Sequence, residues 1–423
     1  MTAEAEPKFR RIRRSASQAN LESRHQGREG RMLENALRTP PQGREGYSLT
    51  HGLHPYPARF HPNLPRTILK WLAQEHGDPP RLCDPFMGGG TLLVESLCRG
   101  WEVTGNDINP IAALVARERC RSRLPKHAVM VWNALEFLQN EVERRRRDKI
   151  RVEHPHLSML KTHYQPHIFA EMLQWSDCLE QLYPGPDRDT LRFVFSSLVG
   201  KFSRRIEEGN GGEKKEKGNF PRGAFSLWMQ RKTREVLERQ QDLSRRLPDP
   251  KMRPQIWQQD VQELSLPQGC DPFDCLITSP PYPGTYDYLD HHRLRLRWLH
   301  FSIQELALKE IGTRRQHSAA QWKEVFRTCM LKMRQVTVSG GHCFLVLGDW
   351  VDQGHKTDAL EYVEKYADSV GWAVEGAASV RRPVYEEQLK EDFGESGRWE
   401  HLIWLRNQVQ ARPPSSIPTE EEE

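Results

Sequence analysis

The residues with the clearest chemical potential form the segment Thr278-Ser-Pro-Pro-Tyr282, which directly follows a short apolar run, Cys275 to Ile277. Such a run is typical of a buried strand in a parallel sheet, and the paired prolines cannot continue it. The chain must therefore leave the sheet at the carboxyl end of this strand, where open α/β folds bind their ligands. One hydroxyl, two rigid prolines and one aromatic ring then suit a flat substrate that carries an amino group: Ser279, Pro280, Pro281 and Tyr282.

A second candidate site surrounds a glycine loop far upstream. Residues 81–86 are predicted to form a strand that contains an acid, Asp84, residues 87–91 a glycine loop, and residues 92–99 a helix. Glycines let a ligand approach the backbone closely, and a helix N-terminus offers unpaired N–H groups to a carboxylate. Asp84 would repel a diphosphate but could accept hydrogen bonds from an ammonium group. The loop therefore predicts an amino-acid-like ligand.

The next predicted strand, residues 102–105, leads directly into a second acid. An acid at the end of the second strand is the usual place to hold ribose hydroxyls in a nucleotide-type fold, and Asp107 occupies that position. Asp84 and Asp107 together fit a single ligand that carries both an amino-acid group and a ribose. S-adenosylmethionine is such a ligand.

These motifs resemble those of the amino-group DNA methyltransferases. Residues 84–91, Asp-Pro-Phe-Met-Gly-Gly-Gly-Thr, match the DPFxGxGT motif, and residues 279–282 match SPPY. The turn is more similar to that of the cytosine-N4 branch than to the DPPY or NPPY of adenine-N6 enzymes. The resemblance covers about residues 50–120 and 255–405. It implies an α/β, Rossmann-like class I methyltransferase fold with a mostly parallel twisted sheet, and methyl transfer from S-adenosylmethionine to the N4 amine of a flipped-out cytosine in DNA.

The same resemblance implies further parts of the cofactor pocket. Residues 54–60 are similar to the family segment that supplies a Phe, and in the family an acid after the third strand reads the cofactor's adenine amino group. Residues 255–260 are the preferred third strand, although residues 131–134 compete for this role. The expected cofactor-binding residues are Phe60, Asp84, Pro85, Phe86, Gly88, Gly90, Thr91, Asp107, Asn109 and Asp260.

The chain divides into five predicted parts. Residues 1–46 are expected to be a basic disordered tail and residues 408–423 an acidic one. Residues 47–134 and 253–407 would form the two parts of the methyltransferase domain. Between them, apolar residues at helical spacing predict a helical insertion over residues 135–252, which could recognise the DNA target or could be a dimer or partner surface.

Composition restricts the function classes. In 423 residues, 37% are hydrophobic and 28% charged, and no apolar run approaches the roughly 20 residues of a membrane span. Eight scattered cysteines without a CxxC pair, and no visible secretory segment, predict free thiols in the cytoplasm. Basic runs such as residues 10–14 and 144–147 favour a polyanion such as DNA, but could equally be solvated surface.

The same residues exclude some chemistries and leave others open. No cysteine follows a proline, which argues against cytosine-C5 methylation, and the histidines lack the spacing of metal ligands, so no metal is expected. Adenine-N6 methylation, methylation of an RNA guanine N2 amine, and a catalytically inactive nucleic-acid-binding protein remain alternatives. A companion nuclease in a restriction or phage-defence system is compatible with the sequence, and the oligomeric state is not predicted.

Overall fold

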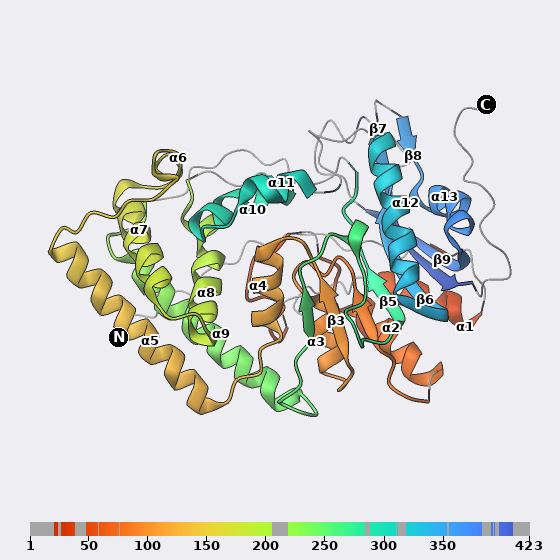
Figure 1. Ribbon diagram of the computed structural model, residues 1–423, viewed down its shortest axis with the longest axis horizontal. Helices are drawn as coiled ribbons and strands as arrows, with labels where there is room; N and C mark the ends of the chain where they lie inside the picture. Colours follow the sequence, from red (N-terminus) through yellow and green to blue (C-terminus); the bar gives the residue numbers. More distant parts are fainter. Residues whose placement is uncertain are drawn as a thin grey trace, which may run out of the picture.

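The computed structural model describes residues 21–23, 27–38, 48–57, 59–75, 77–204, 219–283, 288–309, 311, 319–352, 355–382, 391, 393 and 397–408. Its centre is an eight-stranded sheet with the strand order β1-β9-β10-β6-β5-β2-β3-β4 (Figure 1). The strands are β1 (Leu21–Ser23), β2 (Leu82–Asp84), β3 (Val103–Asn106), β4 (Gln255–Trp257), β5 (Phe273–Thr278), β6 (Thr337–Gly348), β9 (Trp372–Arg382) and β10 (Arg398–Asn407). A separate hairpin pairs β7 (Trp350–Asp352) with β8 (His355–Thr357).

The sheet has the topology predicted from the motifs. Neighbouring strands run parallel from β4 through β3, β2 and β5 to β6, and β10 is antiparallel to both β6 and β9. The chain moves outward from β2 to β3 and β4 on one side, and from β5 to β6 on the other. The order therefore reverses between β2 and β5, which is where doubly wound sheets bind ligands. The predicted Rossmann-like class I methyltransferase fold is confirmed by this strand order.

Both faces of the sheet are buried, which explains why its central strands are continuously apolar. Leu82, Cys275 and Ile277 point to the face covered by α1 (Arg28–Leu37), α2 (Asn63–Glu75), α3 (Thr91–Leu97) and α4 (Pro110–Arg119). Cys83 and Leu276 point to the opposite face, against α12 (Ala319–Gln335) and α13 (Ala359–Tyr366). Each fully buried aliphatic side chain contributes about 1.5–3 kcal/mol to folding, so the site strands are held firmly in register.

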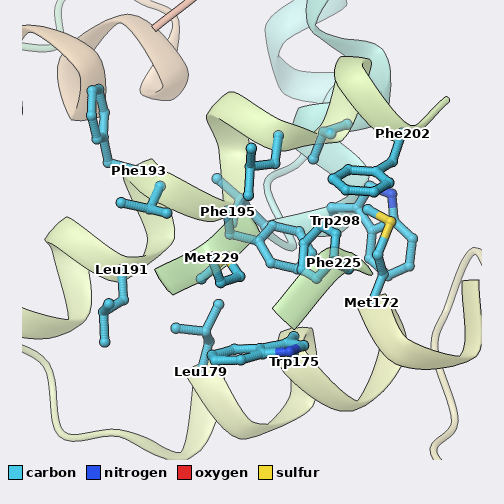
Figure 2. Packing of buried hydrophobic residues seen from close by; sticks show 14 of the residues in the cluster. Met172, Trp175, Leu179, Leu191, Phe193, Phe195, Phe202, Phe225, Met229 and Trp298 are labelled. Atoms are coloured by element: carbon cyan, nitrogen blue, oxygen red, sulfur yellow. The ribbon is translucent and has the colours of Figure 1, made fainter. Parts of the chain in front are cut away.

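The helical insertion is a second packing unit attached to the β3–β4 side of the sheet (Figure 1). It contains α5 (Pro125–Arg147), α6 (Leu157–Lys161), α7 (Pro166–Gln181), α8 (Pro186–Phe202) and α9 (Ala224–Arg246). Figure 2 shows its aromatic core, in which Trp298 of α10 (Tyr288–Trp298) packs among Phe195, Phe225 and Met172. Helix α10, which follows the TSPPY turn in sequence, is therefore part of the core of the insertion; α11 (Ile303–Lys309) packs beside α10.

A buried polar network joins the insertion to the methyltransferase half. Glu118 at the end of α4 accepts hydrogen bonds from Thr190 of α8 at 2.8 Å and from Gln240 of α9 at 3.0 Å. Arg123 donates to Gln240 at 2.7 Å and to Thr190 at 2.6 Å. All four side chains are buried. The orientation of α8 and α9 relative to α4 is therefore fixed by directional contacts as well as by apolar packing.

Three sequence predictions about boundaries are corrected. Residues 1–46 are not wholly a disordered tail, because β1 pairs with β9 and α1 buries Leu33 and Leu37 against α2. The insertion begins at Pro125, inside the predicted first part of the methyltransferase domain. Residues 131–134 lie within α5, so the competing third strand is wrong and β4 takes that place. Residues 409–423 of the predicted acidic tail lie outside the described residues.

The predicted free thiols are confirmed, since all eight cysteines are unpaired. No helix among the described residues is long and apolar enough to cross a membrane.

Candidate active site

The two sequence motifs meet at the reversal point of the sheet. Thr278, the last residue of β5, donates from Oγ1 to Oδ1 of Asp84, the last residue of β2, at 2.7 Å. The backbone N–H of Phe86 points to the same pair and lies 3.2 Å from each of the two oxygens. The glycine motif and the TSPPY motif, far apart in sequence, are therefore joined through one side-chain hydrogen bond.

Asp84 is prepared for a cationic partner. Its carboxyl is fully buried, and Oδ2 has no hydrogen-bond donor among the described residues. Burial, with a smaller contribution from nearby Asp107, raises the pKa of Asp84 to about 7, although the hydrogen bonds from Thr278 and Phe86 act to lower it. An ammonium group at Oδ2 would satisfy this oxygen and favour the ionised carboxylate. The site thus fits the amino-acid end of S-adenosylmethionine.

The glycine loop is shaped by its neighbours as well as by any ligand. Gly88 and Gly90 have left-handed backbones with φ of 47° and 72°. A Cβ on Gly89 would lie 2.2 Å from Nη1 of Arg119, and one on Gly90 would lie 2.9 Å from Cβ of Ala116. Thr91 is buried at the start of α3. Side chains larger than hydrogen are therefore excluded from the loop before a ligand is considered.

Asp107 lies beside the loop at the end of β3. Its Oδ2 accepts the Gly88 N–H at 2.9 Å and its Oδ1 accepts the Asn109 N–H at 2.8 Å. Partial burial raises its pKa to about 6, while the two backbone bonds favour the charged form. Each carboxylate oxygen keeps a second lone pair, which suits ribose hydroxyls. Asn109 instead caps α4 by accepting the Ile111 N–H at 2.9 Å.

The other predicted pocket residues occupy neighbouring positions. Asn106 at the end of β3 donates to the carbonyls of Pro85 at 3.2 Å and Gln259 at 3.0 Å. Asp260 follows Gln259 and caps the short helix η3 (Val261–Glu263) by accepting the Gln262 N–H at 2.9 Å. Phe86 packs on the α12 side of the sheet and Phe60 on the α2 side. Their roles in binding an adenine stay predictions.

The turn after β5 is held by contacts from three distant elements. The Trp322 indole of α12 donates to the Pro281 carbonyl at 3.2 Å. The Ser279 hydroxyl lies 3.3 Å from the Tyr282 hydroxyl, which donates to Oε1 of Glu400 on β10 at 3.2 Å. The Tyr282 ring lies against Gly348, and the Arg398 guanidinium is 5.3 Å from its centroid. Ser279, Pro281 and Tyr282 remain partly exposed, whereas Pro280 is buried.

A groove of about 640 Å³ opens between residues 52–56, Arg59 and helices α8 and α9. Tyr56 lines it and also lies against the glycine loop, since a Cβ on Gly88 would be 3.2 Å from its ring. Lys201 places its Nζ 3.5 Å from the Trp228 ring centroid. The charged residues of the groove are Arg59, Lys201, Lys232 and Glu235. The groove therefore carries more positive than negative charge, with an aromatic wall.

Sequence reasoning missed several residues that hold the site. Arg119 is fully buried and donates to the carbonyls of Gly89 and His54 at 2.8 Å each, which ties the glycine loop to the aromatic loop. Glu400 and Arg398 come from β10, and only the pairing of strands in the sheet brings them to Tyr282 of the turn. Charged residues inside a basic, polar chain give no local signal of such contacts. Arg119 is the last residue of the largely apolar helix α4, and this position was the one available hint of its role.

Asp349, Asp358 and His401 are close enough to hold a metal ion, but both carboxylates and both ring nitrogens already have hydrogen-bond partners. Asp349 accepts the Ala359 N–H at 3.1 Å and pairs with His401 at 2.9 Å and with Lys356 at 3.2 Å. Asp358 caps α13. This cluster ties β6, β10 and α13 together, and the predicted absence of a catalytic metal stays a prediction.

Known proteins with similar sequences are Type II methyltransferases. The chain is 25% identical over 272 residues to M.MvaI of Kocuria varians, covering 61% of this chain and 59% of that protein. It is 26% identical over 287 residues to M.BsoBI of Geobacillus stearothermophilus, covering 60% and 53%. The matches thus span little more than half the length of these relatives. They confirm the resemblance to the amino-group methyltransferase family without separating its cytosine-N4 and adenine-N6 branches.

No family model matches the chain. Among solved structures, TrmN from Thermus thermophilus superposes with a TM-score of 0.32 at 11% identity, covering 83% of this chain and 50% of that one. The rRNA methyltransferase aviRa from Streptomyces viridochromogenes gives a TM-score of 0.31 at 12% identity, covering 91% and 96%. These superpositions are too loose to support a conclusion, and the fold assignment rests on strand order and register.

Proposed function

We propose that the protein is an S-adenosylmethionine-dependent DNA methyltransferase that acts on the exocyclic N4 amine of cytosine. The observation that carries this proposal is the 2.7 Å hydrogen bond between Thr278 and Asp84. It places a turn suited to an amine next to a buried carboxylate suited to an ammonium group. The named relatives, both Type II methyltransferases, support DNA as the substrate.

The cofactor pocket would be built from the ends of three neighbouring strands. Asp84 would bind the ammonium group, Asp107 the ribose hydroxyls, and Asp260 the adenine amino group. Phe60 and Phe86 would flank the adenine. S-adenosylmethionine supplies a methyl group on a positively charged sulfur, which departs as a neutral thioether. The protein's part is to orient the acceptor amine in line with that departure.

The TSPPY turn would orient the acceptor. Ser279 Oγ and the carbonyl of Pro280 would accept hydrogen bonds from the two amino hydrogens, which favours a tetrahedral nitrogen with a free lone pair. Pro281 keeps the turn rigid, and the ring of Tyr282 would pack on the base. Such a base must leave the duplex, a step that costs a few kcal/mol of unstacking.

The choice of cytosine depends on the first residue of the turn. A serine is a weaker acceptor than an aspartate, and this suits cytosine, whose N4 amine lies beside a more basic ring nitrogen than adenine's. Adenine N6 is the closest alternative, because it needs the same pocket and the same two acceptors. We keep an RNA guanine amine as a further alternative substrate.

We further propose that the groove beside residues 52–59 contacts the DNA backbone. Three cations with one acid complement a phosphate chain, and Tyr56 connects the groove to the glycine loop. The α8 and α9 walls belong to the insertion, which supports its predicted role in target recognition. A companion nuclease and a cytoplasmic location stay predictions, and neither bears on the chemistry of the site.

The test is methyl transfer in vitro. Purified protein, S-adenosylmethionine with a labelled methyl group, and unmethylated plasmid DNA or bulk tRNA are incubated, and the products are digested to nucleosides and separated by mass. N4-methylcytosine from DNA is the expected product. N6-methyladenine alone would move the assignment to the adenine branch, and labelled tRNA without labelled DNA would overturn DNA as the substrate. No binding of S-adenosylmethionine by calorimetry would instead favour a protein without catalysis.

A further inference from the structure

A chain of hydrogen bonds connects the TSPPY turn to strands β10 and β9. Ser279 Oγ lies 3.3 Å from the Tyr282 hydroxyl oxygen, which in turn lies 3.2 Å from Glu400 Oε1. The other carboxylate oxygen of Glu400 receives both Nε and Nη2 of Arg382 at 2.7 Å each. The chain therefore runs from a hydroxyl at the proposed acceptor site to a fixed carboxylate–guanidinium pair.

The chemistry of the end groups sets the direction of this chain. A guanidinium only donates hydrogen bonds, and an ionised carboxylate only accepts them. Tyr282 must then donate its proton to Glu400, and among the described residues Ser279 is positioned to donate to its oxygen. Burial, followed by the charge of Glu400, raises the pKa of Tyr282 well above its usual value, so its proton is retained.

We propose that Glu400 is a positioning residue that fixes the polarity of the Ser279 hydroxyl, so that Ser279 presents lone pairs, and not its proton, to the incoming amine. This inference rests on the proposed function. A serine hydroxyl has one proton and two acceptor sites. With the proton directed to Tyr282, both acceptor sites are available to an amino hydrogen. With the opposite polarity, the hydroxyl would donate to the nitrogen lone pair that must attack the methyl group.

The sheet holds the carboxylate in place. Glu400 is the direct partner of Gly348 in the antiparallel ladder between β10 and β6. Gly348 leaves room for the Tyr282 ring, because a Cβ there would lie 3.0 Å from Cε2 of the ring. The pairing that places Glu400 also creates the space for the Tyr282 ring, so the position of the carboxylate is set by strand register.

The Glu400→Gln substitution should reverse the chain without changing its shape. Arg382 offers two donors, so the amide oxygen of the glutamine must face Arg382 and its NH₂ group must face Tyr282. The Tyr282 hydroxyl would then accept from this amide and donate to Ser279. Ser279 would lose an acceptor site and gain a proton directed toward the substrate.

Removing the tyrosine hydroxyl should cancel this effect. Tyr282→Phe keeps the ring but removes the acceptor of the Ser279 proton. The Ser279 hydroxyl can then rotate, but no neighbouring donor forces its proton toward the substrate. We expect kcat for methyl transfer to fall roughly 100-fold in Glu400→Gln and about 10-fold in Tyr282→Phe. The double variant should return to the level of Tyr282→Phe, and the KM for DNA and the Kd for S-adenosylmethionine should stay within about twofold throughout.

The control is Glu375→Gln, which removes a carboxylate of similar exposure that pairs with Arg406 at 3.1 Å across the same two strands. It should leave kcat unchanged. Urea unfolding verifies that each variant is folded. If Glu400→Gln does not fold, the inference is tested by Tyr282→Phe alone, whose kcat should fall while its KM stays constant. Unchanged kcat in Tyr282→Phe, or a double variant as slow as the product of the two single effects, would overturn the inference. Wild-type protein that methylates no DNA overturns the proposed function itself, and the inference with it.

Discussion

Replacing Asp84 with asparagine separates the charge of this residue from its shape. Asparagine can place its Oδ1 where the Asp84 Oδ1 lies and keep the bonds from Thr278 at 2.7 Å and from the Phe86 N–H at 3.2 Å. The amide NH₂ then occupies the position of Oδ2, which has no donor among the described residues. The substitution therefore removes a buried negative charge and leaves the known contacts in place.

The pKa of Asp84 sets the size and sign of the effect on stability. Burial raises this pKa from 3.8 to about 7, so the ionised carboxylate is disfavoured in the unliganded protein. Below about pH 4 the residue is protonated in both folded and unfolded chains, and it costs nothing. Between pH 4 and 7 the unfolded chain releases the proton first, so stability falls as pH rises. Above pH 7 the cost is constant at roughly 4 kcal/mol.

The Asp84→Asn protein should therefore be more stable than wild type at pH 8, by about 2–4 kcal/mol after an allowance of up to about 2 kcal/mol for its unpaired amide, and at pH 4 it should be equal in stability or less stable by no more than that allowance. It should no longer bind S-adenosylmethionine, because the NH₂ group at the position of Oδ2 cannot accept a hydrogen bond from an ammonium group. Urea unfolding without cofactor at several pH values, with calorimetry at pH 8, measures both quantities. A variant that is less stable at pH 8, or that binds the cofactor normally, would refute the assignment of Oδ2 to the ammonium group.

Three further outcomes are expected. Tyr282→Ala removes the ring from the turn and should lower kcat by at least about 100-fold while cofactor affinity stays within about twofold, as measured by methyl transfer and calorimetry. Lys201→Glu in the groove should weaken DNA binding and reduce the slope of log affinity against log salt by about 1 to 2. Lys70→Glu, on the exposed side of α2, should change neither quantity. If the slope for Lys201→Glu equals that of wild type, the groove does not bind the DNA backbone. Arg123→Ala removes a buried guanidinium that donates to Gln240 and Thr190 and lies 3.9 Å from Glu118, and it should lower the free energy of unfolding by about 3–5 kcal/mol in urea unfolding. Arg117→Ala, at an exposed position of α4, should cost much less.

The sequence predicted those parts of the site that are written in local patterns. Strands β2, β3 and β5 are short, and each ends in or leads directly into an acid or paired prolines, so both their existence and the residues at their carboxyl ends could be read directly. Parallel topology then brings those ends to one edge. The β4 strand was also anticipated, although Asp260 lies beyond its end as a cap and not within it.

The parts that were missed depend on long-range partners. Helix α1 is short and highly polar, and its few apolar residues are buried only because it docks on α2 and β9. Glu400 is 118 positions from Tyr282, and their contact follows from the β6–β10 register, which no local pattern specifies. Arg119 likewise belongs to an apolar helix, where its charge is explained only by two loop carbonyls.

The glycines of residues 88–90 show why the motif is stricter than ligand approach alone requires. Gly89 faces Arg119, whose guanidinium also binds the carbonyl of His54. Gly88 donates to Asp107 and lies against the Tyr56 ring. The loop is thus fixed simultaneously to β3, to α4 and to the segment that forms the groove. Thr278 attaches the TSPPY turn to Asp84, which ends β2 and leads into the glycine loop, so the acceptor turn and the start of the loop are held together. The cofactor site, the acceptor turn and the groove are therefore connected through direct contacts. The three glycines are required because several elements pack closely against this loop.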